Sequence, residues 1–234
     1  MSLLTTIQAA ADLLGIERPP SVIGSADQQV RQLYAIALEE AEDLASAHDW
    51  SALMREETFT TVATAAQTAA IPTDLDRFLN MSFFDRDTRR PVLGPITPQL
   101  WQGIQANPQL NRVFFAFRVR AGQMLFTPTP PAGQTVAYEY ITTKWARKSD
   151  LSVDYTAWQA DTDTSYLDEG LIKLGIRWRW KKSKGLPYGE DFDTYTQQRD
   201  QVRGRDGASP AISLTGREYM LGILPNLPEG NWNQ

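Results

Sequence analysis

The sequence predicts an α+β protein. Helices from the two ends of the chain form one bundle, an antiparallel β-sandwich or barrel module is inserted between them, and an extended C-terminal tail follows. Three observations predict this class. Apolar residues recur at helical spacing near both ends, they alternate at strand spacing in the middle, and 205–234 follows neither period. We expect a helical domain in two parts, 1–52 and 150–204, an inserted β module over 53–149 and an extended arm over 205–234.

Four segments carry the signals of helices. They are predicted over 2–15, about 26–47, Tyr166 to about Lys184, and 189–204. Ser2 and Ser25 are the expected N-caps of the first two, because a serine hydroxyl can accept a hydrogen bond from a free backbone N–H of the first turn. The second helix carries an acidic cluster that we expect to be a solvated face, formed by Glu39, Glu40, Glu42 and Asp43.

The middle of the chain shows the β signals. Strands are predicted over 54–62, 65–71 and 82–94, with a short helical turn over 73–81 and a helix over 97–104. Thr97 is the expected N-cap of that helix and Pro98 its first residue. Residues 113–142 alternate most clearly and predict an antiparallel meander, with Val136, Tyr138 and Tyr140 on one face.

Composition excludes several classes of site. The chain has no cysteine and one histidine, His48, so disulfides, thiolate metal sites and a cysteine nucleophile are excluded and a zinc site is disfavoured. We expect no catalytic residue, cofactor or metal. No apolar run is long enough for a membrane helix and no signal peptide is recognisable, so we expect a soluble protein in the cytoplasm of the cell that makes it. The net charge of −5 disfavours a generally basic nucleic-acid binder.

A basic segment stands out against this acidic background. It comprises Lys173, Arg177, Arg179, Lys181, Lys182 and Lys184. Interleaved with Trp178 and Trp180, these cations could contact DNA through phosphates and stacking, or meet an acidic partner surface. The alternative is a helix with buried tryptophans and cations that favour its C-terminal end.

The C-terminal arm is too apolar for a free tail and too rich in glycine, proline and asparagine for a helix. Its candidate anchors for docking on another chain are Tyr219, Met220, Leu221, Ile223, Leu224, Leu227 and Trp232. The alternative is an arm that folds back on its own domain.

Two rival functions remain at this point. A cell-wall glycosidase needs two carboxylates about 5 to 10 Å apart. The candidates for such a pair are Asp161, Asp163, Asp168, Glu169, Glu190 and Asp191, and nothing in their spacing singles out two of them. A different structural component, such as a subunit that builds a tube, is the second rival. A tube subunit should be mostly β, and the long terminal helices argue against it.

Two stretches resemble head-to-tail adaptor proteins of short-tailed bacteriophages, of the tail tubular protein A type. They begin at Ile71 and Trp158, and together with the helix–β–helix order the likeness covers most of 1–205. The matching motifs are Ile71-Pro72-Thr73-Asp74, Arg90-Pro91-Val92-Leu93-Gly94-Pro95 with Trp101, Leu167-Asp168-Glu169, and Lys184-Gly185-Leu186-Pro187-Tyr188.

The resemblance implies a structural virion protein without catalytic residues. Such adaptors form a ring of about twelve copies that follows the portal's symmetry. The ring would surround the DNA channel in the neck of the virion, binding the portal protein on one side and the tail nozzle or tail-tube protein on the other. It would hold the packaged genomic DNA, touch it transiently and pass it at ejection.

Overall fold

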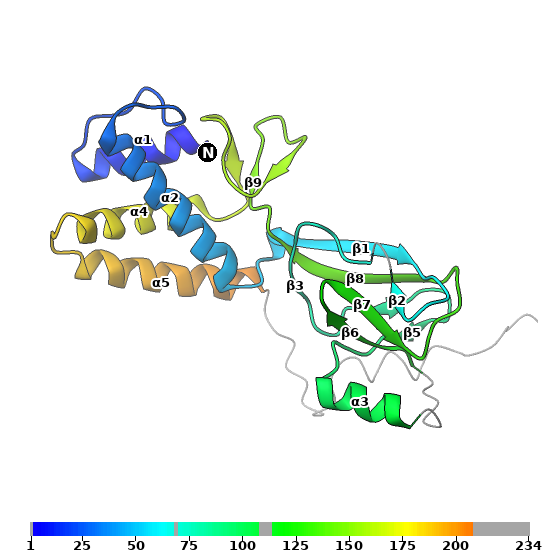
Figure 1. Ribbon diagram of the computed structural model, residues 1–234. Helices are drawn as coiled ribbons and strands as arrows, with labels where there is room; N and C mark the ends of the chain where they lie inside the picture. Colours follow the sequence, from blue (N-terminus) through cyan, green and yellow to red (C-terminus); the bar gives the residue numbers. More distant parts are fainter. Residues whose placement is uncertain (1, 68–69, 108–113, 208–234) are drawn as a thin grey trace, which may run out of the picture.

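The computed structural model describes residues 2–67, 70–107 and 114–207, and Figure 1 shows two bodies side by side. The first is helical and contains α1 (Leu3–Leu14), α2 (Gln28–Ala47), α4 (Glu169–Ser183) and α5 (Gly189–Asp206). Helix α4 contacts the other three. The second body contains most of the strands. The predicted α+β class, with a bundle built from both ends of the chain, is confirmed.

The helix ends follow from local capping, with two corrections. At α1 the Ser2 hydroxyl accepts from the backbone of Thr5, as predicted. At α2 the predicted cap Ser25 is wrong, because the carboxylate of Asp27 accepts from Gln29 N at 2.7 Å and starts the helix two residues later. A carboxylate also suits the positive end of the helix better than a hydroxyl does.

Helix α4 starts later than predicted and α5 ends later. Asp168 caps α4, and Tyr166, before the helix, donates its backbone N–H to Trp145 O. Helix α5 continues to Asp206, two residues beyond the predicted end at 204. The Asp206 carboxylate accepts from Ser51 N at 2.9 Å and from Ser51 Oγ at 2.7 Å, which holds the end of α5 against the chain just before the first strand.

The larger sheet has the order β1 (Met54–Thr60), β8 (Thr135–Thr142), β4 (Phe84–Asp85) and β5 (Arg90–Pro91), and β3 (Leu75–Phe78) also pairs with β8. The helical turn predicted over 73–81 is therefore wrong. Pairing with β8 decides the conformation of this segment, because Leu75, Arg77 and Phe78 find backbone partners across the sheet.

The second sheet has the order β2 (Ala66–Gln67), β7 (Gln123–Thr127) and β6 (Ala116–Arg120). Strands β6 and β7 form the expected hairpin, but β8 leaves it and pairs in the first sheet, so the predicted three-stranded meander is wrong. The proline-rich connection before β8 crosses from the second sheet to the first, and residues of both sheets share one core.

The β module has an aromatic core. Val136, Tyr138 and Tyr140 lie on one buried face of β8, as predicted, and pack with aromatic rings of both sheets. Among the rings beside them are Phe59, Phe78, Phe83, Phe117 and Phe126. Helix α3 (Pro98–Ala106), which lies below the sheets in Figure 1, has the predicted cap: the Thr97 hydroxyl accepts from Leu100 N, and Pro98 is its first residue.

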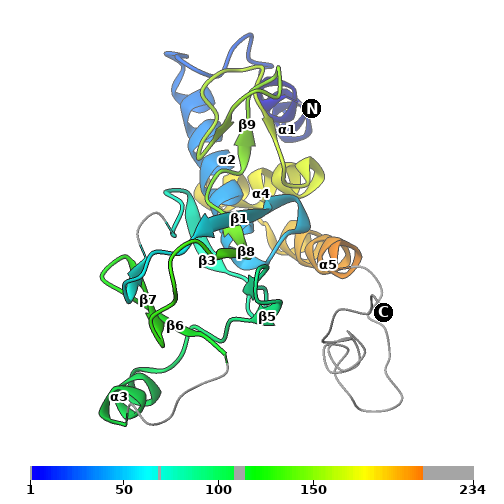
Figure 2. The same cartoon turned by 90° about the vertical axis from the view of Figure 1, so that its right-hand side faces the viewer.

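A third, small sheet was not predicted. It consists of β9 (Ala146–Arg147) between β10 (Asp154–Tyr155) and β11 (Thr164–Ser165). Trp145 and Trp158 pack edge to face at 4.5 Å between ring centroids and belong to the helical core. Figure 2 accordingly shows β9 with α1 and α2, away from the β module.

Strand β8 connects the two bodies through successive residues. Tyr140 is buried in the aromatic core and Ile141 in the helical core, because neighbouring side chains of a strand point to opposite faces. One strand thus ties both cores together. Among the described residues, no helix has the length and apolarity that crossing a membrane requires.

Candidate functional site

The basic segment lies on α4, and Arg179 is its most connected residue. The guanidinium donates from Nε to Glu40 Oε2 at 2.7 Å and from Nη1 to Glu39 Oε1 at 2.5 Å, and a third bond reaches Asp43. All three acids belong to α2. The cluster therefore joins a helix from the N-terminal part of the chain to one from the C-terminal part.

The expectation that the acidic cluster of α2 is a solvated face is wrong for Glu40. Its side chain is 0% exposed, whereas Glu39 and Asp43 stay exposed. Glycine at position 175 makes this burial possible, since a Cβ there would lie 2.2 Å from Glu40 Cδ. Burial raises the pKa of Glu40, and the hydrogen bonds from Tyr195 and Arg179 counteract only part of that rise.

Replacing Gly175 by alanine should destabilise the protein, although alanine is the better helix former. The added methyl group must displace the buried Glu40 side chain, and such overpacking costs about 1–3 kcal/mol. Gly103 offers a matched control, because it also lies inside a helix and nothing is within 4 Å of its added Cβ. Urea unfolding should show a lower free energy of unfolding for Gly175→Ala and one that is higher by about 0.5–1 kcal/mol for Gly103→Ala. Equal changes in the two variants would contradict the close contact between position 175 and Glu40.

A second ionic cluster joins α4 to α5. Asp191 is buried and bonds both Arg177 and Lys181, the latter at 2.5 Å from Nζ to Oδ2. Burial raises the pKa of Asp191, but the hydrogen bonds from these two cations outweigh it and hold the pKa below its usual value. Three cations of the basic segment, counting Arg179, are thus ion-paired within the helical body.

The remaining three cations of the basic segment lie outside these two ionic clusters. Lys184 donates to Gln32 Oε1 at 2.8 Å and stands 4.5 Å from the Trp180 ring centroid, and Lys182 stands 5.6 Å from that of Trp178. Both lysines are exposed, while Lys173 is half-buried. Trp178 and Trp180 are buried, as the alternative of a helix with a tryptophan stripe requires. Contact of this segment with DNA or an acidic partner stays a prediction.

The carboxylates weighed for a glycosidase have structural partners. Asp161 accepts from the backbone of Val22 and Ile23, and Asp163 from that of Gln159 and Ala160. Asp168 caps α4 and Asp191 holds its two cations, while Glu169 and Glu190 lie in the first turns of α4 and α5. His48 ends α2, with Nε2 3.5 Å from an Asp206 carboxylate oxygen. The described residues contain no group of acids or histidine placed to hold a metal.

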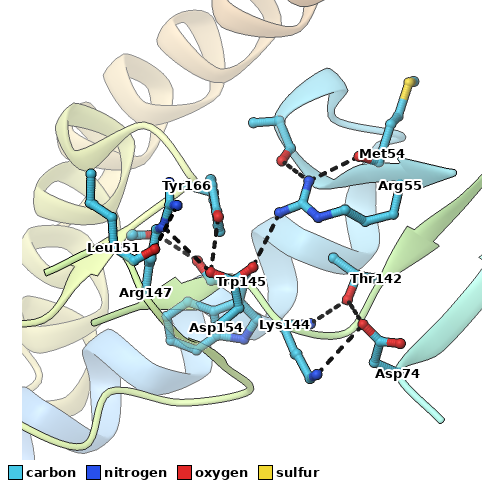
Figure 3. Close-up of polar contacts among 12 residues, drawn as sticks. Met54, Arg55, Asp74, Thr142, Lys144, Trp145, Arg147, Leu151, Asp154 and Tyr166 are labelled. Carbon is cyan, nitrogen blue, oxygen red and sulfur yellow. Dashed lines mark hydrogen bonds and ion pairs between the residues drawn. The ribbon is translucent and has the colours of Figure 1, made fainter. Parts of the chain in front are cut away.

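A polar junction that sequence reasoning missed lies between the two bodies, and Figure 3 shows it. Asp154 accepts from the Tyr166 hydroxyl at 2.9 Å and from Arg55 Nη2 at 3.5 Å, and Arg147 Nε is 3.6 Å away. Both guanidinium groups also face the Tyr166 ring, at 4.9 and 5.4 Å from its centroid. Arg55 belongs to the β module, Arg147 and Asp154 to the small sheet, and Tyr166 directly follows β11, so the Arg55 contacts cross from one body to the other.

Asp74, directly before β3, forms a second polar cluster at the end of β8, within the β module. It accepts from Thr142 Oγ1 at 2.8 Å and from the Tyr140 hydroxyl at 3.2 Å, and Lys144 Nζ is 3.8 Å away. Burial raises the pKa of Asp74, but these partners outweigh it and hold the pKa below its usual value. Burial and the nearby carboxylate raise the pKa of Tyr140 to about 12. The partners come from distant parts of the chain, so no local pattern could have identified them.

The seven anchors predicted in the C-terminal arm lie outside the described residues. The described chain ends at Gly207, directly after the contact of Asp206 with Ser51. Docking through the arm therefore stays a prediction, and the structure adds only the place from which the arm starts.

Residues 1–214 match the family described as SU10 adaptor protein. No match was found among curated proteins. The family match confirms the expected bacteriophage adaptor, while the tail tubular protein A type stays a prediction. Because the match extends over most of the 234 residues, the chain belongs to the SU10 adaptor protein family and is a structural adaptor of a bacteriophage virion.

Proposed function

We propose that this protein is a head-to-tail adaptor of the tail tubular protein A type. About twelve copies form a ring between the portal protein and the tail nozzle or tail-tube protein. The ring surrounds the DNA channel, retains the packaged genome and passes it at ejection. The protein acts in the neck of the virion and is present in the host cytoplasm before assembly.

The two-body architecture is the observation that carries this proposal. A neck subunit has to contact one assembly on each side and keep the two in register. Strand β8 contributes side chains to both cores, and Asp154 of the small sheet bridges to Arg55 of the β module. Such a junction resists bending, because a change of angle would disturb the packing of β8 in both cores together with the part-buried contacts of Asp154.

The charge distribution suits a channel through which DNA moves. The chain carries a net charge of −5, and three cations of the basic segment are ion-paired to acids of α2 and α5. A cation that is already paired with an acid releases fewer counterions from DNA, so these three pairs weaken the hold of the basic segment on phosphates. Contact with DNA would then be transient, through the exposed Lys182 and Lys184.

Assembly on the portal tests this function directly. The isolated protein should sediment mostly as a monomer, because ring contacts are completed only when the portal supplies part of the interface. Mixed with portal-bearing capsids that lack tails, it should bind as a ring visible by electron microscopy. A stable ring formed alone at low concentration would contradict the dependence on the portal, and failure to bind such capsids would contradict the adaptor function.

A further inference from the structure

The connection between α4 and α5 exposes a cluster of large apolar side chains, which we call the α4–α5 patch. Leu186 is 50% exposed, Tyr188 38% and Phe192 40%. The rings of Tyr188 and Phe192 both pack on the Trp178 ring, at 6.3 and 5.1 Å between centroids. Apolar exposure that is clustered in this way, rather than scattered, is typical of an interaction site.

The patch is bordered by two lysines. Lys182 Nζ stands 5.6 Å from the centroid of the Trp178 ring, and Lys184 donates to the neutral side chain of Gln32. Within the part of the chain that the structure describes, neither lysine is ion-paired with an acid. A partner that suits this surface therefore combines large apolar side chains with an acidic group.

The C-terminal arm has this chemistry and a sufficient length. Glu218 stands directly before Tyr219, the first of the apolar anchors. The patch lies at the end of the helical body away from the β module, and the chain leaves α5 at its opposite end, at Gly207 (Figure 1). The 18 residues of α5 span about 27 Å. Tyr219 lies 12 positions beyond Gly207, a length of backbone that reaches up to about 40 Å.

The surface of α5 favours an arm that arrives from another copy. An arm returning to the patch of its own chain would have to reverse at Gly207 and run back along α5. Between Phe192 and Gly207 the exposed side chains of α5 are all polar and offer no apolar contact on that path: Asp193, Thr194, Gln197, Asp200, Gln201 and Arg205. A neighbouring copy can bring its arm to the patch without crossing this face.

We propose that the arm of one copy docks on the α4–α5 patch of the neighbouring copy. Apolar anchors between Tyr219 and Leu227 cover Tyr188 and Phe192, and Glu218 lies beside the bordering lysines. Each copy then gives one arm and receives one, and such head-to-tail contacts close into a ring. The inference rests on the proposed ring and names the contact that joins its subunits.

Photo-cross-linking tests the contact without assuming which anchor meets which ring. Phe192 is replaced by the photoreactive residue benzoylphenylalanine in isotopically labelled chains. These are mixed with an excess of unlabelled wild type, bound to portal-bearing capsids and irradiated. We expect a dimer in which labelled position 192 is joined to an unlabelled peptide from 208–234. The same photoreactive residue in place of Leu13, which is 60% exposed on α1, is the control and should not react with the arm.

The outcomes separate the contact from the adaptor function. A link between position 192 and the arm of the same labelled chain would overturn the inference, because the arm would then pack on its own domain. Capsids that carry the protein without any link from position 192 to 208–234 overturn the inference but leave the proposed function intact. Capsids that bind no wild-type protein overturn both.

An asparagine at position 186 tests the patch by affinity. At least half of the Leu186 side chain is in solvent, so Leu186→Asn should leave the melting temperature of the monomer unchanged. It removes apolar area that the arm covers, so binding to portal-bearing capsids should weaken about tenfold or more. Leu13→Asn is the matched control, because Leu13 is also an exposed leucine of the helical body, and it should bind as the wild type does. Equal binding of the two variants would overturn the inference.

Discussion

Removal of residues 208–234 is expected to leave the thermal midpoint unchanged and to abolish attachment to portal-bearing capsids. The predicted anchors lie in this segment, and each buried one can contribute about 1.5–3 kcal/mol to docking. Backbone ordering opposes docking by roughly 1–2 kcal/mol per residue, so several anchors must engage together. Differential scanning calorimetry and capsid pull-down measure the two effects. A lowered midpoint would show that the arm packs on its own domain, and normal attachment would show that it has no docking role.

The position of the stop codon matters for this experiment. A chain ending at Gly207 keeps Asp206 and its two hydrogen bonds to Ser51, whereas one ending at Gly204 loses them together with the contact to His48. The shorter chain should therefore melt at a lower temperature than the longer one. Comparing the two separates the loss of the arm from damage to the end of α5.

Arg179→Met is expected to cost about 3–5 kcal/mol of folding free energy, because it leaves Glu40 charged and buried without a cation. Arg177→Met is the matched control on the same helix. Its partner Asp191 keeps Lys181 at 2.5 Å, so the loss should be smaller. Urea unfolding at pH 7 measures both. Similar losses for the two variants would contradict the special position of Glu40. The double variant Glu40→Gln/Arg179→Met should recover part of the stability, since position 40 then holds no unpaired buried charge.

The loss of stability in Arg179→Met should depend on pH, because the pKa of Glu40 is raised. Burial already raises the pKa of Glu40 above 4.5, and loss of the cation raises it further. A carboxyl whose pKa is higher in the folded state takes up a proton on folding, so its contribution to stability falls as pH rises through that pKa. The defect should therefore shrink as the pH is lowered from 7 toward 4.5. A defect that stays constant over this range would mean that Glu40 does not cause it.

The polar contacts of the site are of two kinds, those between near neighbours in the sequence and those between distant residues. Local features could be predicted from the sequence. The Ser2 cap, the Thr97 cap and the helical placement of the basic segment depend on residues a few positions apart. Arg179 and Glu40 lie 139 positions apart, Arg55 and Asp154 lie 99 apart, and Asp74 and Thr142 lie 68 apart. Glu40 shows the difference best, since its local neighbours are acidic and exposed and only the approach of Gly175 on α4 buries it.

By itself the sequence determined the α+β class, the four long helices and the alternating face of β8, because periodicity and caps act within one element. Its motifs also carry the resemblance to phage adaptors. Tertiary structure decided which strands pair. It made a strand of 75–78 and moved β8 out of the meander into the other sheet. It also created the third sheet and the junction that ties the two bodies together. Backbone pairing and burial of charge depend on what a distant segment brings alongside, and that information is absent from any local stretch of the chain.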